Sequence, residues 1–207
     1  MTVGLTLDHL VISAARLEQG VAHVERLLGV AMVPGGKHAL MGTHNALLGL
    51  GEIYLEVIAI DPAAPRPAHP RWFDLDNFTG PPRLSHWVAR THDLAGALAL
   101  APPGSGVQTA LSRGDLRWSM AVPADGRLPF GGGFPGLICW QGDAHPVQRL
   151  PDAGWRLSGL QITHPQAADL RAAMAKFEGD RMARVDPGDV FSLAAILSNP
   201  GGSVLLA

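Results

Sequence analysis

The sequence predicts an α+β fold built from two complete βαβββ modules and a partial third repeat. Three segments that start alike, at residues 7, 84 and 157, are rich in apolar and β-branched residues and predict short strands. Each is followed by apolar residues at helical spacing and then by short stretches in which apolar and polar residues alternate, separated by Gly and Pro. Chance similarity of three short segments is the alternative, and the recurring helix argues against it. Because such a unit cannot bury its own sheet face, we expect the units to pack together.

The repeat divides the chain into module 1 at 1–61, a Pro-rich connection at 62–82, module 2 at 83–146 and the partial third repeat at 147–207. Helical periodicity that ends at Gly or Pro predicts three helices, over 13–29, 91–100 and 165–177. Alternating segments predict further strands over 45–50, 53–60, 108–111, 117–122, 136–141, 191–197 and 203–206.

Composition limits the classes of partner and compartment. Apolar residues make up 47% of the chain and charged residues 16%, which excludes disorder and allows a sizeable core. Sixteen basic and eighteen acidic residues form no basic tract, so we expect neither nucleic acid nor a membrane surface as partner. A single cysteine, Cys139, excludes a disulfide within the chain. Without a long apolar run or a signal-peptide pattern, we expect a soluble, cytoplasmic protein.

His9, His86 and Glu56 are the candidate metal ligands. The two histidines occupy the same position in the first strand of modules 1 and 2, and Glu56 lies in the middle of an apolar strand. A lone buried carboxylate costs several kcal/mol unless it is paired or bound to a cation. Two His and one Glu in one cavity suit a divalent metal ion such as Fe, Mn, Ni, Co or Zn, with open positions for substrate. The alternatives are hydrogen-bonded core histidines and a Glu56 that pairs with an arginine or lies on a solvated edge.

Several segments together resemble the vicinal oxygen chelate superfamily, in particular its glyoxalase-like domain branch. They are Leu-Asp-His-Leu-Val at 7–11, Gly-Gly-Lys-His at 35–38, Gly-Thr-His-Asn-Ala-Leu-Leu at 42–48, Tyr-Leu-Glu-Val-Ile at 54–58, Leu-Ser-His-Trp-Val at 84–88, and Gly-Leu-Ile-Cys-Trp at 136–140 followed by His145-Pro146. The resemblance implies paired βαβββ modules whose sheets curl around a cleft. It also implies a metal held between the modules by His9, Glu56 and His86.

One position departs from the superfamily pattern. Its enzymes often carry a second carboxylate on the last strand of module 2, at about the position of Cys139. In glyoxalase I-type isomerisation that second carboxylate helps to move the proton, so its absence argues against this reaction. The remaining three ligands resemble the metal site of the ring-cleaving dioxygenases of the superfamily. Cys139 is either a soft ligand that favours Zn or a small buried hydrophobic residue.

Other residues complete the list of candidates. His44 is a candidate acid/base or substrate-polarising group, and packing beside a turn capped by Thr43 and Asn45 is the alternative. Strand alternation puts His44 and Asn45 on opposite faces, so only one of them faces the cleft. Three tryptophans either form the wall of a substrate pocket or fill the core: Trp87, Trp118 and Trp140. Two arginines either bind a substrate carboxylate or are solvated: Arg113 and Arg117.

The sequence therefore predicts a metal-dependent enzyme that binds a small oxygen-bearing substrate by bidentate chelation. Isomerase, lyase and dioxygenase chemistry all stay open, because the fold does not choose between them. The alternatives are a small-molecule-binding or sequestering module of the same fold and a scaffold whose site has decayed. A homodimer is compatible with the apolar edges that such curled sheets often leave.

Overall fold

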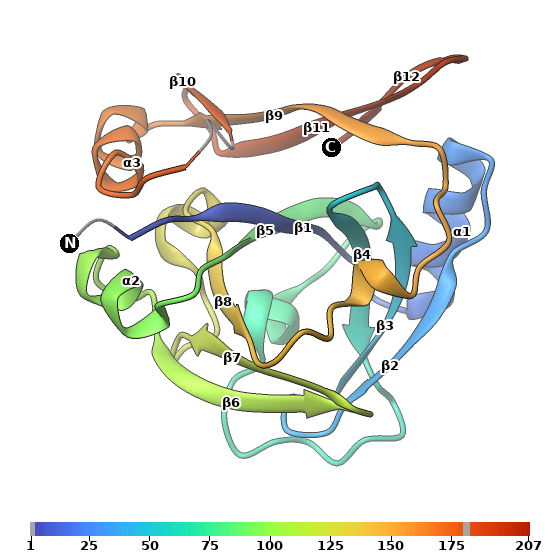
Figure 1. Ribbon diagram of the computed structural model, residues 1–207, viewed down its shortest axis with the longest axis horizontal. Helices are drawn as coiled ribbons and strands as arrows, with labels where there is room; N and C mark the ends of the chain where they lie inside the picture. Colours follow the sequence, from blue (N-terminus) through green and yellow to red (C-terminus); the bar gives the residue numbers. More distant parts are fainter. Residues whose placement is uncertain (1–2, 180–182) are drawn as a thin grey trace.

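The computed structural model describes residues 3–179 and 183–207, so the first two residues of module 1 lie outside it (Figure 1). The elements of module 1 are β1 (Thr6–Ser13), α1 (Leu17–Leu28), β2 (Val33–His38), β3 (Thr43–Gly49) and β4 (Tyr54–Ile60). The connection contains the short 3-10 helix η1 (Trp72–Asn77). The elements of module 2 are β5 (Arg83–Arg90), α2 (Leu94–Leu100), β6 (Val107–Arg113), β7 (Leu116–Val122), η2 (Pro129–Gly132) and β8 (Gly136–Trp140).

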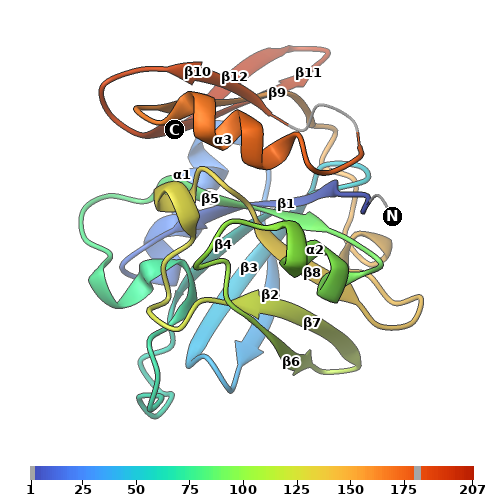
Figure 2. The same cartoon turned by 90° about the vertical axis from the view of Figure 1, so that its left-hand side faces the viewer.

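The two modules share one eight-stranded sheet in the order β2-β3-β4-β1-β5-β8-β7-β6. Figures 1 and 2 show this sheet curling around a central space, with β1 and β5 side by side across its middle. The expected α+β fold of paired, curled βαβββ modules is therefore confirmed.

The central pair of β1 and β5 is antiparallel and contains two irregularities. Leu7 pairs with Ala89 and His9 with Val88, so Asp8 is an extra residue in β1. Further along, Val11 pairs with His86 and Ile12 with Leu84, so Ser85 is an extra residue in β5. Such β-bulges re-aim the neighbouring side chains.

The third unit forms its own sheet. After the short helix η3 (Pro146–Gln148), its elements are β9 (Arg156–His164), α3 (Ala167–Met174), β10 (Arg184–Pro187), β11 (Ser192–Asn199) and β12 (Gly202–Leu206). Its strand order is β10-β9-β11-β12, so the first strand pairs in parallel with the second. In module 1 the first strand, β1, pairs in parallel with the fourth strand, β4. The third unit thus repeats the order of elements along the chain, with no strand lost, but connects them differently in space.

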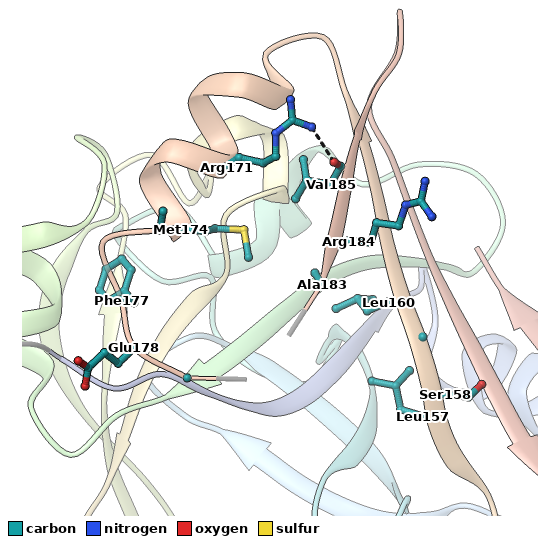
Figure 3. Close-up of a pocket in the computed structure, with 13 residues that line it drawn as sticks. Leu157, Ser158, Leu160, Arg171, Met174, Phe177, Glu178, Ala183, Arg184 and Val185 are labelled. Carbon is teal, nitrogen blue, oxygen red and sulfur yellow. Dashed lines mark hydrogen bonds between the residues drawn. The ribbon is translucent and has the colours of Figure 1, made fainter. Parts of the chain in front are cut away.

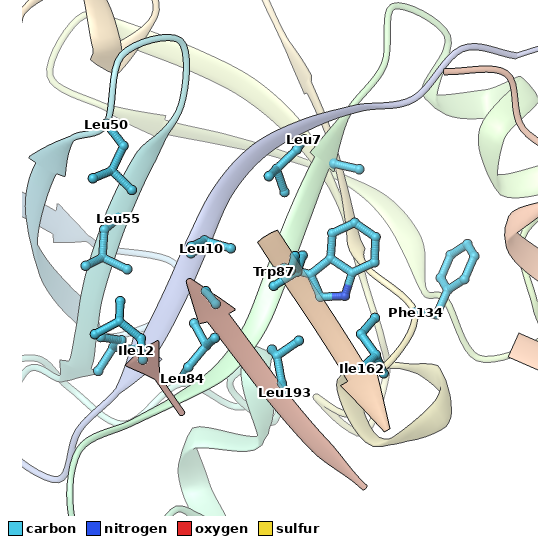
Figure 4. Close-up of a cluster of buried hydrophobic side chains, with 14 of the residues drawn as sticks. Leu7, Leu10, Ile12, Leu50, Leu55, Leu84, Trp87, Phe134, Ile162 and Leu193 are labelled. Atoms are coloured by element: carbon cyan, nitrogen blue, oxygen red, sulfur yellow. The ribbon is translucent and has the colours of Figure 1, made fainter. Parts of the chain in front are cut away.

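The larger sheet has an apolar core on each face. The outer face packs against the third unit, and Leu10 and Trp87 meet Ile162 and Leu193 there (Figure 4). The inner face carries a second cluster that contains Val11, Val88 and the side chains of η1. The third unit is therefore built on a core that it shares with both modules.

The boundaries expected from the repeat fall close to element ends. β4 ends at Ile60 and β5 begins at Arg83, whereas the boundary after residue 146 falls inside η3. The sequence did not locate β2, although a complete βαβββ module 1 requires a strand there, and β10 was not expected in the partial third repeat. None of the described helices has the length and apolar character that a membrane crossing requires.

Candidate functional site

A small cavity of about 30 Å³ lies against the inner face of the eight-stranded sheet, with room for one or two water molecules. Strands from both modules and η1 contribute its walls. The residues that line it are His9, His38, Tyr54, Glu56, Trp72, Phe73, Arg113, Trp118, Met120, Ile138 and Trp140. Titratable side chains inside an aromatic wall make it the best candidate for the functional site.

His9 lies between two carboxylates. Its Nδ1 atom is 2.6 Å from Asp8 Oδ1, and its Nε2 atom is 3.5 Å from Glu56 Oε2. The imidazole also stacks on the ring of Tyr54, with centroids 4.5 Å apart. Because Asp8 accepts the proton of Nδ1, the lone pair of a neutral His9 is on Nε2, which faces Glu56.

Asp8 is fully buried, yet it has several donors. Its Oδ2 atom is 3.0 Å from both Trp140 Nε1 and His145 Nε2. Burial opposes ionisation, but the hydrogen bonds from His145 and His9 outweigh it and hold the pKa of the Asp8 carboxyl well below its usual value. Asp8 therefore stays ionised and fixes the orientation of His9.

Asn45 holds Glu56 from the other side. Its Nδ2 atom donates to Glu56 Oε1 at 2.5 Å, and its Oδ1 atom accepts from Gly36 N and Arg113 Nη1, both at 2.9 Å. These partners define which end of the amide faces Glu56. The approach also requires Gly35, because a Cβ atom there would lie 2.1 Å from Asn45 Oδ1. A cation, a carboxylate and an imidazole thus line one cavity.

His38 at the end of β2 is buried in the same wall. Burial, and after it the positive charge of Arg113, lowers the pKa of His38 to about 3. Its Nδ1 atom lies 3.0 Å from Thr43 Oγ1. His38 is therefore neutral at physiological pH.

The structure brings His9 and Glu56 together but places His86 elsewhere. His86 Nδ1 lies 3.0 Å from Ser85 Oγ, and its ring packs on Phe73 with centroids 5.1 Å apart. It lines a separate pocket of about 400 Å³. Burial lowers the pKa of His86 to about 4.

The positions of His9, Glu56 and His86 show how far these residues fit the expected metal ion. His9 Nε2 and Glu56 Oε2 converge as two donors, and the bond from His9 Nδ1 to Asp8 is typical of a metal-ligating histidine. Among the described residues, however, no three His, Cys, Asp or Glu side chains are grouped to hold a metal ion. The set of His9, Glu56 and His86 does not fit a three-ligand site in this arrangement.

His44 and Cys139 also lie away from the cavity. Asn45 pairs with Ile58 and faces the cavity, whereas His44 pairs with Ala59 and projects to the opposite face of β3. Cys139 packs against the core on the outer face of the sheet.

The strand register identifies the true counterpart of Glu56 in module 2. Val11 pairs with Glu56, and its equivalent Val88 pairs with Gly136. The sequence estimate of Cys139 was therefore wrong by three positions, and strand alternation puts Cys139 on the face opposite to Ile138 and Trp140, which line the cavity. A Cβ atom at Gly136 would lie 3.0 Å from Met120 Cε and 3.3 Å from Val88 Cγ2, so a side chain there would have to displace these neighbours by a few tenths of an ångström.

The sequence predicted some of the residues that line the cavity but not the hydrogen bonds that hold His9 and Glu56. Trp118, Trp140 and Arg113 line the cavity, while Trp87 fills the outer core. Asp8 and Asn45 were given no role in the chemistry. In the sequence, the bulge residues Asp8 and Ser85 are marked only by being polar and directly preceding each strand histidine.

Comparison with known proteins agrees with this architecture. A family model described as a glyoxalase-like domain matches residues 7–177. The chain belongs to the glyoxalase-like domain family. No curated protein is similar enough to the chain to count as a relative.

Solved structures share the fold of this glyoxalase-like protein. A hypothetical protein from Staphylococcus aureus is 12% identical with a TM-score of 0.62, and the match covers 97% of this chain and 98% of that chain. The Mn(II)-bound glyoxalase from Novosphingobium aromaticivorans is 8% identical with a TM-score of 0.51, and the match covers 99% of this chain and 82% of that chain. At these identities the similarity concerns the fold alone.

A larger cavity of the glyoxalase-like protein, about 860 Å³, lies in the third unit between α3, β9 and β10 (Figure 3). Its walls are mainly apolar, with Leu157, Leu160, Met174 and Phe177 among them. No histidine is among its described lining residues. Size alone therefore does not make it the functional site, and the chemistry is concentrated at His9 and Glu56.

Proposed function

We propose that the protein is an enzyme that transfers a proton on a small oxygen-bearing substrate, with His9 and Glu56 as the proton-transfer pair. The observation that carries the proposal is the 3.5 Å separation of His9 Nε2 and Glu56 Oε2 on the wall of one cavity, with His9 fixed by Asp8. Positioned acid/base groups of this kind contribute about 10²- to 10⁴-fold to a rate.

The chemistry suited to these groups is proton transfer beside a carbonyl group. One of the pair removes a proton from the carbon next to the carbonyl, and the electron pair of the C–H bond moves to the carbonyl oxygen to give an enolate. Arg113 lines the same cavity and supplies a positive charge for that oxygen. Return of the proton to the other face of the same carbon completes an epimerisation. In an α-hydroxy-carbonyl compound, transfer of the hydroxyl proton to the former carbonyl oxygen and return of the carbon-bound proton to the former carbonyl carbon complete an isomerisation.

A divalent metal stays a prediction of the family resemblance. When bound, such an ion polarises substrate oxygens as a Lewis acid. His9 and Glu56 offer two ligands, and the proposed proton transfer does not depend on a third from His86. Metal content and the shift of the melting temperature with Mn, Fe, Ni, Co or Zn, compared between wild type and Glu56→Gln, test this prediction.

Deuterium exchange tests the proposed proton transfer directly. Small α-hydroxy-carbonyl compounds and α-keto acids are incubated with the protein in D2O, and loss of the C–H signal is followed by NMR. We expect exchange to fall by about 10²- to 10⁴-fold in both Glu56→Gln and His9→Gln and to stay unchanged in His23→Gln on helix α1. Exchange that survives both site substitutions, or that is lost in His44→Gln and kept in His9→Gln, contradicts the proposal.

The aromatic wall favours a second candidate, a module that binds a small molecule without converting it. Tyr54, Trp72, Phe73, Trp118 and Trp140 all line the cavity, and aromatic side chains supply much of the contact energy in ligand sites. A binding module retains its ligand after Glu56→Gln and shows no exchange with any of these compounds, which distinguishes it from the enzyme.

A further inference from the structure

We propose that the pocket at His86 is an outer binding site for a small anion with an apolar body, and that the Phe73 side chain separates it from the cavity of His9 and Glu56. This inference rests on the proposed function, because it identifies the class of substrate that reaches the proton-transfer pair. It assigns a role to a buried histidine that the proposed chemistry does not use.

The cavity at His9 and the pocket at His86 differ in volume, and the difference indicates that most of a substrate binds in the pocket. The cavity at His9 measures about 30 Å³, which is too small for any substrate of several heavy atoms. The pocket at His86 measures about 400 Å³, within the range of small-molecule sites. A substrate whose body occupies the larger space needs to bring only its reactive end to His9.

Phe73 stands between the two spaces. Among the described residues, it is the single one that lines both of them. Its ring packs on His86 on one side and contributes to the wall around His9 and Glu56 on the other. Removing or turning this one side chain therefore joins the pocket to the cavity.

The backbone at this point is unusual. Phe73 and Asp74 both adopt left-handed conformations, with φ of 57° and 51°. Residues other than glycine adopt this conformation uncommonly, and such positions cluster at ligand-binding and switch regions. The strain supports a functional reason for holding Phe73 where it is.

The charges and walls of the outer pocket define the ligand class. The guanidinium of Arg83 lies 4.2 Å from the Phe78 ring centroid and donates to Thr79 O at 2.7 Å, and no described carboxylate lies within ion-pair distance of it. Asp74, the acidic side chain among the described lining residues, is instead paired with Arg127 at 3.3 Å, and Ala207 lines the same pocket. A cation without a carboxylate partner favours an anionic ligand. The apolar walls that would cover its body are Phe73, Phe78, Leu84, Phe191 and Leu193.

Benzoate, a small aromatic carboxylate, is the probe, and the imidazole NMR signals of His86 and His9 report on the two spaces. In the wild type we expect benzoate to shift the signals of His86 and to leave those of His9 in place. In Phe73→Gly, whose new residue fits the left-handed backbone, benzoate shifts both sets. Phe78→Ala is the matched control, because it enlarges the outer pocket without opening the partition, so the His9 signals stay in place. Arg83→Gln weakens benzoate binding by about tenfold.

Each other outcome overturns a defined part of the inference. Benzoate that leaves His86 unshifted in the wild type removes the outer site. His9 signals that shift in the wild type, or equally in Phe78→Ala and Phe73→Gly, remove the role of Phe73. Phe73→Asn, which also tolerates the left-handed backbone, replaces Phe73→Gly if that variant does not fold. Because these experiments follow binding alone, absence of deuterium exchange contradicts the proposed function without touching this result.

Discussion

Asp8 and Ser85 occupy equivalent places in the two modules: each is the extra residue of a β-bulge, and each bonds the Nδ1 atom of the histidine that follows it. The chemistry of the two pairs differs. The Asp8 carboxylate aims His9 at Glu56, whereas the Ser85 hydroxyl holds His86 in the outer pocket. The two modules therefore repeat their backbone while assigning different roles to equivalent histidines.

Asp8→Asn tests the orientation of His9. With Trp140 and His145 still donating to the side-chain oxygen, the new amide NH2 faces His9 Nδ1, so Nε2 takes the proton and loses its lone pair. We expect deuterium exchange to fall by about 10²- to 10⁴-fold while the variant stays folded. The exposed Asp189→Asn is the control. Full exchange in Asp8→Asn means that Asp8 does not position His9.

Asn45→Ala tests the network around Glu56. The substitution leaves Glu56 Oε1, the Gly36 N–H and one Arg113 donor without their partner in a buried site. We expect the free energy of unfolding to fall by about 1–3 kcal/mol in urea denaturation. The exposed Asn77→Ala, which removes a surface bond to Asp74, is expected to change it by about 0.5 kcal/mol or less. Equal effects of the two substitutions contradict a buried network.

The fold was largely predictable from the sequence, because its signals are local. Repeated strand-helix patterns set the paired modules, and the helices ended where Gly29 and Pro102 indicated. Strand β2 was missed because Pro34, Gly35 and Gly36 are typical of a turn, and only its pairing with β3 makes it a strand. The order of strands in the third unit depends on contacts between distant segments, which no local pattern contains.

The site was predictable only in part, for a related reason. Alternation placed His9 and Glu56 on one face, and both line the cavity, although the bulge at Asp8 leaves Leu7 in the outer core. The strand register keeps His86 on that face, paired with Val11, but the Phe73 side chain packs on it and lines both its pocket and the cavity. A wall contributed by a distant segment arises from tertiary packing rather than from spacing along the chain.

His38 predicts how stability depends on pH. Its pKa in the folded protein is about 3, below the usual value of 6.5, so between these values the unfolded chain binds more protons than the folded one. Stability is therefore full above about pH 6.5 and falls as the pH decreases, by about 2 kcal/mol from this residue between pH 6.5 and pH 5. Urea denaturation at pH 7, 6 and 5 measures the slope, and we expect His38→Gln to reduce it. An unchanged slope in that variant means that His38 is not held neutral by burial.

Ile162→Ala tests whether the third unit folds together with the two modules. Ile162 of β9 is fully buried against the core that contains Trp87 and Leu10, and the Trp155 side chain also donates to Leu28 O at 3.1 Å (Figure 4). We expect a loss of about 2–5 kcal/mol, with one unfolding transition that coincides by tryptophan fluorescence and far-UV circular dichroism. The exposed Val190→Ala in the same unit is expected to cost about 0.5 kcal/mol or less. Two separate transitions in the Ile162→Ala variant would show that the segment 147–207 is an independent domain, because a shared core forces the units to unfold together.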